Sequence, residues 1–388
     1  MAPSPIPLGI YIQVPFCQTK CTYCNFHTGV VSRDRYQPYA KAVCREIRES
    51  SATCAQAVDT VYFGGGTPSL LDPAALQQIV YALHHIYKMD SLEATLEADP
   101  ETITTEKAAA WLSSGFNRLS LGAQSFSDRE LQSTGRMHRC ADIFRAAQVA
   151  RDAGFRDISM DLIAGLPHQT RKTWEESLDA LLRIRPEHIS IYMLEIDEGS
   201  RLGRESLAGG SRYGAGAIPG DDAIAEFYEW ACARLDVDGY EHYEISNWAL
   251  PGLRSRHNLK YWRREPYIGF GAGAHSFDGS TRWANVHDPA RYAALVEQGM
   301  SPHEQIESVT PSQALEEEFF LGLRQLEGID LAGIERKYGA ALDDRVAALR
   351  GRIAGLHAQG LVDLEGTRLR LAPGRLAISN EVFVELLG

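Results

Sequence analysis

The chain has 388 residues, of which 44% are hydrophobic and 23% are charged, and its formal net charge is −12 at pH 7. This length and composition allow a large buried core in two or three domains, and they exclude intrinsic disorder as the default. The acidic balance disfavours sequence-independent binding to nucleic acid or to anionic membranes, because such binding requires a basic face.

The N-terminal segment predicts neither export nor membrane insertion. Residues 1–16 lack the charged start and the long apolar core of a signal peptide. No apolar run approaches the roughly 20 residues that are needed to cross a bilayer. We therefore expect a cytoplasmic protein without a membrane-spanning segment, and peripheral membrane contact stays open.

Six short β-rich runs then alternate with amphipathic helical stretches. The predicted strands are residues 9–14, 60–65, 93–98, 118–123, 157–163 and 188–194. Most are dense in Val, Ile, Leu and Tyr, as expected for strands that are buried on both faces. Strict alternation of strand and helix implies right-handed βαβ units and a parallel sheet, either doubly wound or curved into a partial barrel.

Glycine, polar or charged residues follow nearly every predicted strand. They are Gly64 to Thr67, Glu97, Gln124, Asp161 and Glu195. Because barrel enzymes place their chemistry at the carboxyl ends of the strands, this distribution favours the barrel. We predict an α/β fold with a partial (β/α)6 barrel over residues 1–200.

The rest of the chain predicts a link and a smaller domain. Residues 201–309 are interpreted as a crossover and extension, in which the glycine-rich stretch 199–220 is a loop and 222–237 a helix. Over 310–388, two or three short helices precede a hairpin in which LVDL and RLRL flank Glu365–Thr367. This texture predicts a mainly helical, winged-helix-like C-terminal domain, whose acidic helices argue against DNA binding. It could cap the barrel mouth, recruit a partner or stabilise the fold.

Seven cysteines in a chain without an export signal argue against a disulfide framework. Three of them, Cys17, Cys21 and Cys24, are spaced C-x3-C-x2-C, which suggests a metal site. The other four are expected to be core thiols without a role: Cys44, Cys54, Cys140 and Cys232.

Three clustered thiols fit an iron–sulfur cluster. A cubane usually takes four thiolates, so three leave one iron free to bind a small molecule through amino and carboxylate groups. The alternatives are chance clustering or a zinc site, in which His27 completes a Cys3His set.

A triple glycine, Gly64 to Gly66, closes the second predicted strand. Glycines let a ligand approach the backbone, and exposed N–H groups can hold a carboxylate. A tight turn is the alternative interpretation of the same residues.

Together, CQTKCTYC and GGGTP resemble the corresponding motifs of the radical S-adenosylmethionine (SAM) enzymes. The resemblance implies a [4Fe–4S] cluster on Cys17, Cys21 and Cys24, with SAM at the open iron as the source of a 5′-deoxyadenosyl radical. Further segments, among them LEADP, RLSLGAQSF, GRMH, MDLIAGLP and residues 243–277, resemble the oxygen-independent coproporphyrinogen oxidase family. Within that family, the chain is most similar to the HemW-type haem chaperones, from about residue 8 to the C-terminus.

The resemblance also implies the residues of the SAM pocket. Tyr11 and Tyr23 would flank SAM, and its amino-acid portion would be held by Gly65, Gly66 and Thr67. The remaining pocket residues would be Glu97, Gln124, Arg136 and Asp161. The alternatives are a helix or loop cap for Asp161 and an ordinary surface salt bridge for Arg136.

Haem binding is implied for the segment RHNLKYW, residues 256–262. Chaperone members of the family carry the same H-N-x-x-Y-W motif, which is implicated in haem binding. His257 is therefore the predicted haem ligand, and His275 is a weaker second candidate. The alternative is that His257 only makes hydrogen bonds in a loop.

Three functions follow. The first is a haem chaperone that binds haem and passes it to an unidentified acceptor protein. The second is a radical SAM methyltransferase of the coproporphyrinogen-oxidase-like class. The third, the coproporphyrinogen III dehydrogenase, is disfavoured because Phe26 stands where those enzymes have a further cysteine, and because only 16 residues precede Cys17. Gln13, where relatives often have histidine, is expected to change little.

Overall fold

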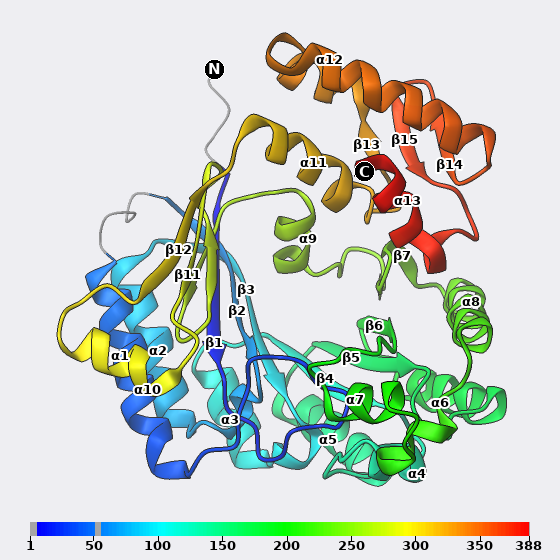
Figure 1. The fold of residues 1–388 in the computed structure, drawn as a ribbon. Coiled ribbons are helices and arrows are strands. Elements are labelled where there is room, and N and C mark those ends of the chain that lie inside the picture. The colour runs from blue at the N-terminus through cyan, green and yellow to red at the C-terminus, as the bar shows by residue number, and fades with distance from the viewer. Residues whose placement is uncertain (1–5, 51–55, 388) are drawn as a thin grey trace.

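The computed structural model describes residues 6–50 and 56–387. Its centre is a run of six strands that pair in sequence order and are all parallel (Figure 1). They are β1 Leu8–Val14, β2 Val58–Gly65, β3 Met89–Ala98, β4 Arg118–Gln124, β5 Asp157–Ala164 and β6 His188–Met193. The predicted α/β fold with a partial (β/α)6 barrel is confirmed.

Helices between these strands cover the convex face of the curved sheet (Figure 1). They are α1 Tyr36–Glu49, α2 Pro73–Ile86, α3 Thr105–Ser113, α4 Asp128–Ser133, α5 Cys140–Ala153 and α6 Arg171–Ile184. Several begin at a side-chain cap. Asp72 accepts from the N–H of Ala74, and Thr170 accepts from the N–H of Thr173. Short 3-10 turns occupy Arg33–Arg35, Pro68–Leu70, Pro100–Thr102, Arg212–Ala217 and Leu376–Ile378.

Further strands extend the sheet at both edges, in the order β12-β11-β10-β9-β1-β2-β3-β4-β5-β6-β8-β7. These strands are β7 Glu241–Glu244, β8 Asn247–Ala249, β9 Tyr267–Phe270, β10 His275–Phe277, β11 Thr281–Asn285 and β12 His303–Ser308. The helices of this region are α7 Arg201–Leu207, α8 Asp221–Val237, α9 Arg256–Trp262 and α10 Pro289–Glu297. The prediction of a loop over 199–220 was wrong in part. Ser200 caps α7 by accepting from the N–H of Gly203, which lets a helix form in glycine-rich sequence.

The C-terminal residues gather a second hydrophobic cluster around Leu315, Phe319, Leu356 and Phe383. Its elements are α11 Pro311–Gly322, β13 Ile329–Asp330, α12 Leu331–Ala358, β14 Val362–Glu365, β15 Arg368–Leu371 and α13 Ser379–Leu387. The predicted hairpin is present as β14 and β15. The preceding helices are α11 and α12, and α12 is divided into two shorter helices by a kink at Leu342, whose backbone is not helical.

Figure 1 places these C-terminal elements near the end of the sheet where β1 begins. The carboxyl ends of the parallel strands lie at the opposite end, and the loop after β1 runs there (dark blue in Figure 1). A cap over the barrel mouth is therefore not what this domain forms. Among the described residues, no helix is long and apolar enough to cross a membrane.

Candidate functional site

The three clustered cysteines lie in the loop that follows β1. Backbone hydrogen bonds hold this loop at both ends: Cys17 donates to the carbonyl of Gly29 at 3.0 Å, and Cys24 donates to that of Cys21 at 3.3 Å. All three cysteines are half-buried. Burial raises the pKa of the Cys17 and Cys24 thiols, so in the absence of a metal both are held protonated.

The geometry of this loop differs from that of a zinc site. Four donors must surround one zinc ion, and within the described ranges no three His, Cys, Asp or Glu side chains converge in that way. The ring of His27, which was to complete a Cys3His set, packs on His287 with 4.3 Å between ring centroids.

Arg136 joins the cysteine loop to the strand ends. Its Nη2 donates to the Asp99 carboxylate at 2.5 Å and to the carbonyl of Gly122 at 2.6 Å, and its Nη1 lies 3.5 Å from the sulfur of Cys21. The side chain is only 10% exposed, so this is not the surface salt bridge that the sequence left open. It supplies a fixed positive charge beside one cluster cysteine.

The glycine segment brings β2 against the cysteine loop. A Cβ on Gly66 would lie 2.5 Å from the carbonyl oxygen of Phe16, and Gly65 has a φ of 109° that favours glycine. The N–H groups of Gly66 and Thr67 donate to the carbonyls of Val14 and Phe16.

The N–H of Gly65 donates to Glu97 at 3.2 Å. The three N–H groups of Gly65, Gly66 and Thr67 are therefore used within the protein. The expectation that exposed N–H groups of the glycine run hold a carboxylate is not met in this structure. The segment therefore fixes the conformation of the chain at the end of β2, and these three N–H groups are not available to a ligand.

Two buried carboxylic acids, Glu97 near the end of β3 and Asp161 in the middle of β5, come from strands that flank β4. Burial raises the pKa of Glu97 to about 7, although hydrogen bonds from Tyr62 and Gly65 oppose the shift. Burial likewise raises the pKa of Asp161 to about 6, against a hydrogen bond with Ser190. Both acids bind protons near neutrality, and a cationic ligand beside them would favour their charged forms.

The remaining predicted pocket residues share the same region. Tyr11, on β1, stacks on Tyr62 with 6.0 Å between ring centroids. Tyr23 lies in the cysteine loop, where burial and the neighbouring Cys21 raise its pKa. Gln124 ends β4 with a φ of 66°, a conformation that non-glycine residues rarely adopt and that costs about 1 kcal/mol or more. Gly65, Thr67, Glu97 and Gln124 thus lie at the carboxyl ends of β2 to β4, whereas Tyr11 lies midway along β1, where its ring also stacks on His257 with 6.3 Å between ring centroids.

His257 contacts the amino-terminal halves of β2 and β3, through Thr60 and Glu93, and is 1% exposed. Its Nδ1 is hydrogen-bonded to the hydroxyl of Thr60 at 2.9 Å, and its Nε2 to the hydroxyl of Tyr261 at 2.9 Å. Its ring stacks on Tyr62 at 5.2 Å, and its backbone N–H donates to Glu93 at 3.0 Å. In this structure both ring nitrogens are therefore used in hydrogen bonds within the protein.

Helix α9, which carries His257, is anchored on both sides. Toward the barrel, the buried ammonium of Lys260 lies 2.8 Å from Asp59 and 3.3 Å from Glu265. Toward the C-terminal domain, the guanidinium of Arg324 packs over the ring of Trp262 at 4.4 Å.

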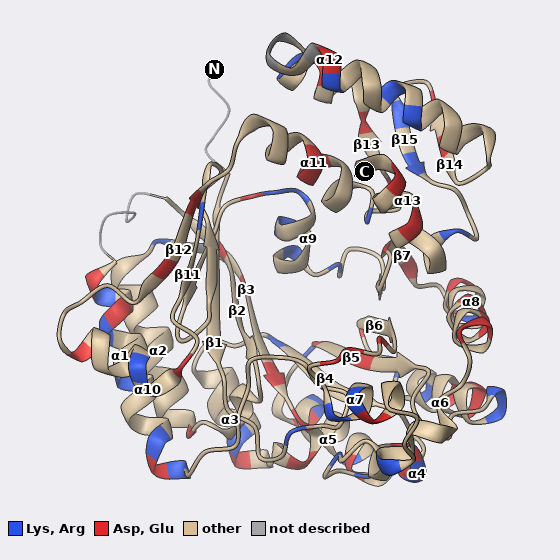
Figure 2. Cartoon of the chain, viewed as in Figure 1, with Lys and Arg blue, Asp and Glu red and all other residues tan. Residues whose placement is uncertain are grey.

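Arg264, which follows α9, pairs with Glu317 at 2.8 Å. Figure 2 shows that α11 carries acidic residues where it approaches α9. The RHNLKYW segment thus links the barrel to the C-terminal domain.

Sequence reasoning missed a group of three histidines at the strand carboxyl ends. His27 comes from the cysteine loop, His275 begins β10, and His287 follows β11. The repulsive charges of His287 and His27 contribute to the lowered pKa of His275, after the larger effect of burial. From the sequence, His27 was considered only as a zinc ligand and His275 only as a second haem ligand, because the spacing of the three along the chain gives no local signal.

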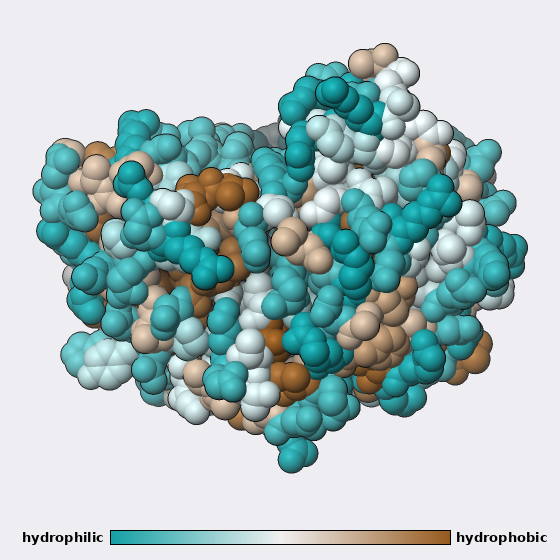
Figure 3. All heavy atoms as spheres, turned by 90° about the horizontal axis from the view of Figure 1, so that it is seen from below, coloured by the Kyte–Doolittle hydropathy of each residue, from teal (hydrophilic) through white to brown (hydrophobic). Residues whose placement is uncertain are grey.

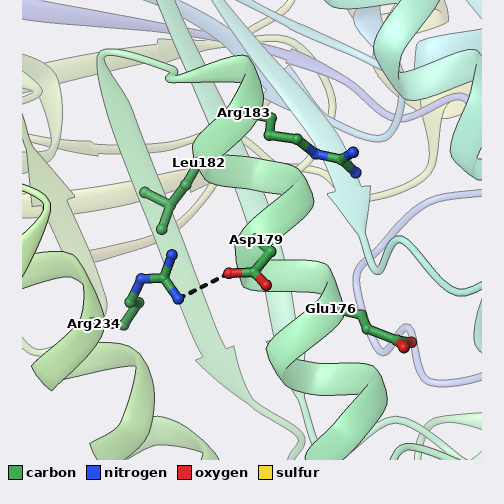
Figure 4. Close-up of a pocket in the computed structure, with 5 residues that line it drawn as sticks. All are labelled: Glu176, Asp179, Leu182, Arg183 and Arg234. Carbon is green, nitrogen blue, oxygen red and sulfur yellow. Dashed lines mark ion pairs between the residues drawn. The ribbon is translucent and has the colours of Figure 1, made fainter.

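The other cysteines and one surface hollow lie away from the cysteine loop. Cys44 is buried in the core, and Cys140 and Cys232 pack against it; Cys54 lies outside the described residues. A hollow of about 560 Å³ lies between α6 and α8, where Arg234 pairs with Asp179 at 2.8 Å (Figure 4). It is on the helical face, away from the strand ends.

Comparison with known families agrees with this architecture. Residues 11–181 match the radical SAM superfamily, and residues 309–374 match the HemN C-terminal domain. The structure is similar to that of coproporphyrinogen III oxidase (HemN) from Escherichia coli, with a TM-score of 0.84 over 98% of this chain and 90% of that one. At 22% identity, this similarity concerns the fold alone.

Sequence relatives are more specific. The heme chaperone HemW of Bacillus subtilis is 35% identical over 97% of this chain and 98% of its own length. The heme chaperone HemW of Mycobacterium tuberculosis is 36% identical over 100% of this chain and 97% of its own. Through these full-length matches, the chain belongs to the HemW family of the radical SAM superfamily.

Proposed function

We propose that this protein is a haem chaperone, which binds haem and transfers it to an acceptor protein while carrying a [4Fe–4S] cluster and SAM. The observation that carries the proposal is the match to HemW relatives along nearly the whole of both chains. That match includes the cysteine loop, the strand ends and the C-terminal domain together, so it is not explained by a shared barrel alone.

Cys17, Cys21 and Cys24 are our proposed cluster ligands. Their position in one half-buried loop supports this, as does the guanidinium of Arg136 beside Cys21. When bound, the cluster and SAM together would supply one-electron chemistry. The residues of this chain would bind, orient and shield these groups.

The SAM pocket is proposed at the carboxyl ends of β1 to β5. Because the N–H groups of Gly65, Gly66 and Thr67 are occupied, this segment would hold the amino-acid portion of SAM through its carbonyl oxygens, which accept from an ammonium group. Tyr11, Tyr23, Gln124 and Arg136 would line the rest of the site. Glu97 and Asp161 would complement its positive charge and hydroxyl groups.

The coproporphyrinogen dehydrogenase remains the less supported function. At its distinguishing position this chain has Phe26, which is 65% exposed and offers no thiolate. For the methyltransferase alternative, no contact in the described residues identifies a methyl acceptor.

Haem ligation by His257 stays a prediction. The structure identifies the hydrogen bonds and packing contacts that would be lost if His257 bound haem iron. Thr60 and Tyr261 would each lose a hydrogen-bond partner, and α9 would have to withdraw from Tyr62 and from the C-terminal domain. Such a change would be visible as increased hydrogen exchange in α9 on addition of haem.

The test uses the full chain, purified anaerobically and reconstituted with iron and sulfide. We expect a [4Fe–4S] spectrum that changes on addition of SAM, stable binding of haem, and no conversion of coproporphyrinogen to protoporphyrinogen. Cys17→Ser should abolish the cluster, and Cys140→Ser, outside the loop, should leave it intact. Coproporphyrinogen turnover, or failure to retain haem, would overturn the proposal.

A further inference from the structure

Asp99, which was not among the residues predicted for the site, joins two residues that were. It directly follows β3, and its carboxylate accepts hydrogen bonds from two side chains. The hydroxyl of Thr67 donates to Oδ2 at 3.0 Å, and Nη2 of Arg136 donates to Oδ1 at 2.5 Å. Thr67 comes from the glycine segment after β2, and Arg136 from the segment between α4 and α5. One carboxylate therefore connects three segments of the site.

Each partner of Asp99 also lies beside a proposed cluster ligand. Nη1 of Arg136 lies 3.5 Å from the sulfur of Cys21. Burial raises the pKa of the Cys17 thiol, and a hydrogen bond with the side chain of Thr67 is among the contacts that lower it in part. Asp99 is thus separated from two of the three cysteines by a single side chain in each case.

The surrounding backbone fixes the pair formed by Asp99 and Arg136. The backbone carbonyl of Asp99 accepts from the N–H and the hydroxyl of Thr102, at 2.9 Å and 2.7 Å. The guanidinium of Arg136 also donates to the carbonyl of Gly122 at 2.6 Å. An added Cβ on Gly122 would lie 3.0 Å from Nη2 of Arg136 and 3.4 Å from Oδ1 of Asp99. A side chain at this position of β4 would therefore crowd the pair.

The charges of this pair are weakly screened. Figure 3 looks from below onto the face where β1 ends, and it shows hydrophilic surface with hydrophobic patches between. The side chains of Arg136 and Asp99 belong to the interior, since they are only 10% and 21% exposed. Charges interact more strongly away from water, and the guanidinium keeps its charge at every relevant pH. Asp99 is the carboxylate that offsets it.

This balance of charge bears on both groups that the site is proposed to hold. The reduction potential of an iron–sulfur cluster depends on net charge and on hydrogen bonds to its sulfurs. A reduced cubane carries one more negative charge than an oxidised one, so an uncompensated cation beside Cys21 would favour the reduced form. The same cation would repel the sulfonium group of SAM.

We propose that Asp99 is a positioning residue of the cluster site, which holds Arg136 beside Cys21 and offsets its charge. Asp99 thereby sets the reduction potential of the cluster and keeps the pocket favourable for a cationic ligand. This inference rests on the proposed function, and it names the group that controls the electrostatics of that site.

The experiment uses the full chain, reconstituted anaerobically with iron and sulfide, and four variants. They are Asp99→Asn, Arg136→Gln, the double variant Asp99→Asn/Arg136→Gln, and the control Asp72→Asn, which removes an exposed carboxylate at the cap of α2. The midpoint potential is measured without SAM, by titration with dithionite followed by electron paramagnetic resonance. The dissociation constant of SAM is measured separately. Iron and sulfide content, together with thermal unfolding, verify that each variant is loaded and folded.

We expect the potential to rise in Asp99→Asn, where Arg136 is left uncompensated, and to fall in Arg136→Gln, where Asp99 is. The double variant removes both charges, so its potential should return toward that of the unmodified protein. Asp99→Asn should also raise the dissociation constant of SAM about tenfold. Asp72→Asn should change neither quantity. A purely structural role of Asp99 would not produce shifts of opposite sign in the two single variants.

An unchanged potential in loaded Asp99→Asn, or shifts of the same sign in both single variants, would overturn this inference and leave the proposed function standing. If a single variant does not load the cluster, the double variant decides. Restored loading in the double variant would support the pair, and continued failure would overturn it. If the unmodified protein took up no cluster, or its cluster did not respond to SAM, the proposed function itself would be wrong.

Discussion

Two histidine regions lie at opposite ends of the same barrel and differ in how their nitrogens are used. His257, within the motif that implies haem binding, is buried and hydrogen-bonded at both ring nitrogens. His27, His275 and His287, which belong to no recognised haem motif, have rings without hydrogen-bond partners among the described residues. The comparison teaches that a sequence motif can identify the family of a protein. Whether a histidine ring nitrogen is free to bind a ligand depends on how the side chain packs.

The largest expected effect is an acid sensitivity that comes from His257. Burial, followed by repulsion from Lys260 and Arg118, lowers the pKa of His257 to about 3. Between pH 6.5 and 3 the unfolded state binds a proton that the folded state does not, so stability falls as pH falls, by about 5 kcal/mol in total.

His257→Gln removes this titration and keeps a hydrogen-bonding side chain. Denaturant unfolding at a series of pH values should therefore show a shallower loss in this variant than in the unmodified protein. His84→Gln, at an exposed site, is the matched control. Equal slopes for all three proteins would show that His257 is not held neutral.

Truncation of the same side chain should also be costly at pH 7. His257→Ala leaves a cavity and removes a partner from both Thr60 and Tyr261, so we expect a loss of about 3 kcal/mol in the free energy of unfolding. His275→Ala, at an exposed ring, should change it by less than about 0.5 kcal/mol. If both variants lost a similar amount of unfolding free energy, His257 would not be more tightly packed than His275, contrary to the comparison above.

The link from α9 to the C-terminal domain can be tested with two adjacent arginines. Arg264 is 6% exposed and pairs with Glu317 and Glu318, whereas Arg263 is 43% exposed and pairs with the exposed Glu327. Arg264→Ala should cost about 2 kcal/mol and raise hydrogen exchange in α9 and α11, because a largely buried pair is broken. Arg263→Ala should cost less than about 0.5 kcal/mol. Equal exchange in both variants would mean that this link does not hold the two parts together.

An effect of opposite sign is expected at Glu97, which joins the His257 region to the strand ends through Tyr62. Its raised pKa means that the unfolded state loses a proton near pH 4.5 and the folded state near 7. This carboxyl therefore lowers stability as pH rises through that range.

Glu97→Gln should stabilise the cluster-free protein by about 3 kcal/mol at pH 8 and have little effect at pH 4.5. Asp72→Asn, at an exposed helix cap, is the control for a simple loss of charge. Destabilisation by Glu97→Gln at pH 8 would show that its hydrogen bonds outweigh the cost of its burial.

The sequence by itself determined the barrel strands, the cysteine loop and the family. These are local properties: runs of β-branched and aromatic residues encode burial on both faces, and C-x3-C-x2-C is contiguous. The predicted strands agree with β1 to β6 to within a few residues. The same local logic failed for α7, because a single cap at Ser200 outweighed the glycines that follow it.

Only the tertiary structure decided which polar groups are free. The N–H groups of Gly65, Gly66 and Thr67 are occupied by carbonyls of the neighbouring loop and by Glu97, and His257 is occupied by Thr60, 197 residues earlier in the chain. His27 meets His287 only because a hairpin closes beside the loop of β1. Hydrogen bonds between residues that are so far apart along the chain depend on how the whole sheet packs. A local pattern of residues carries no information about that packing.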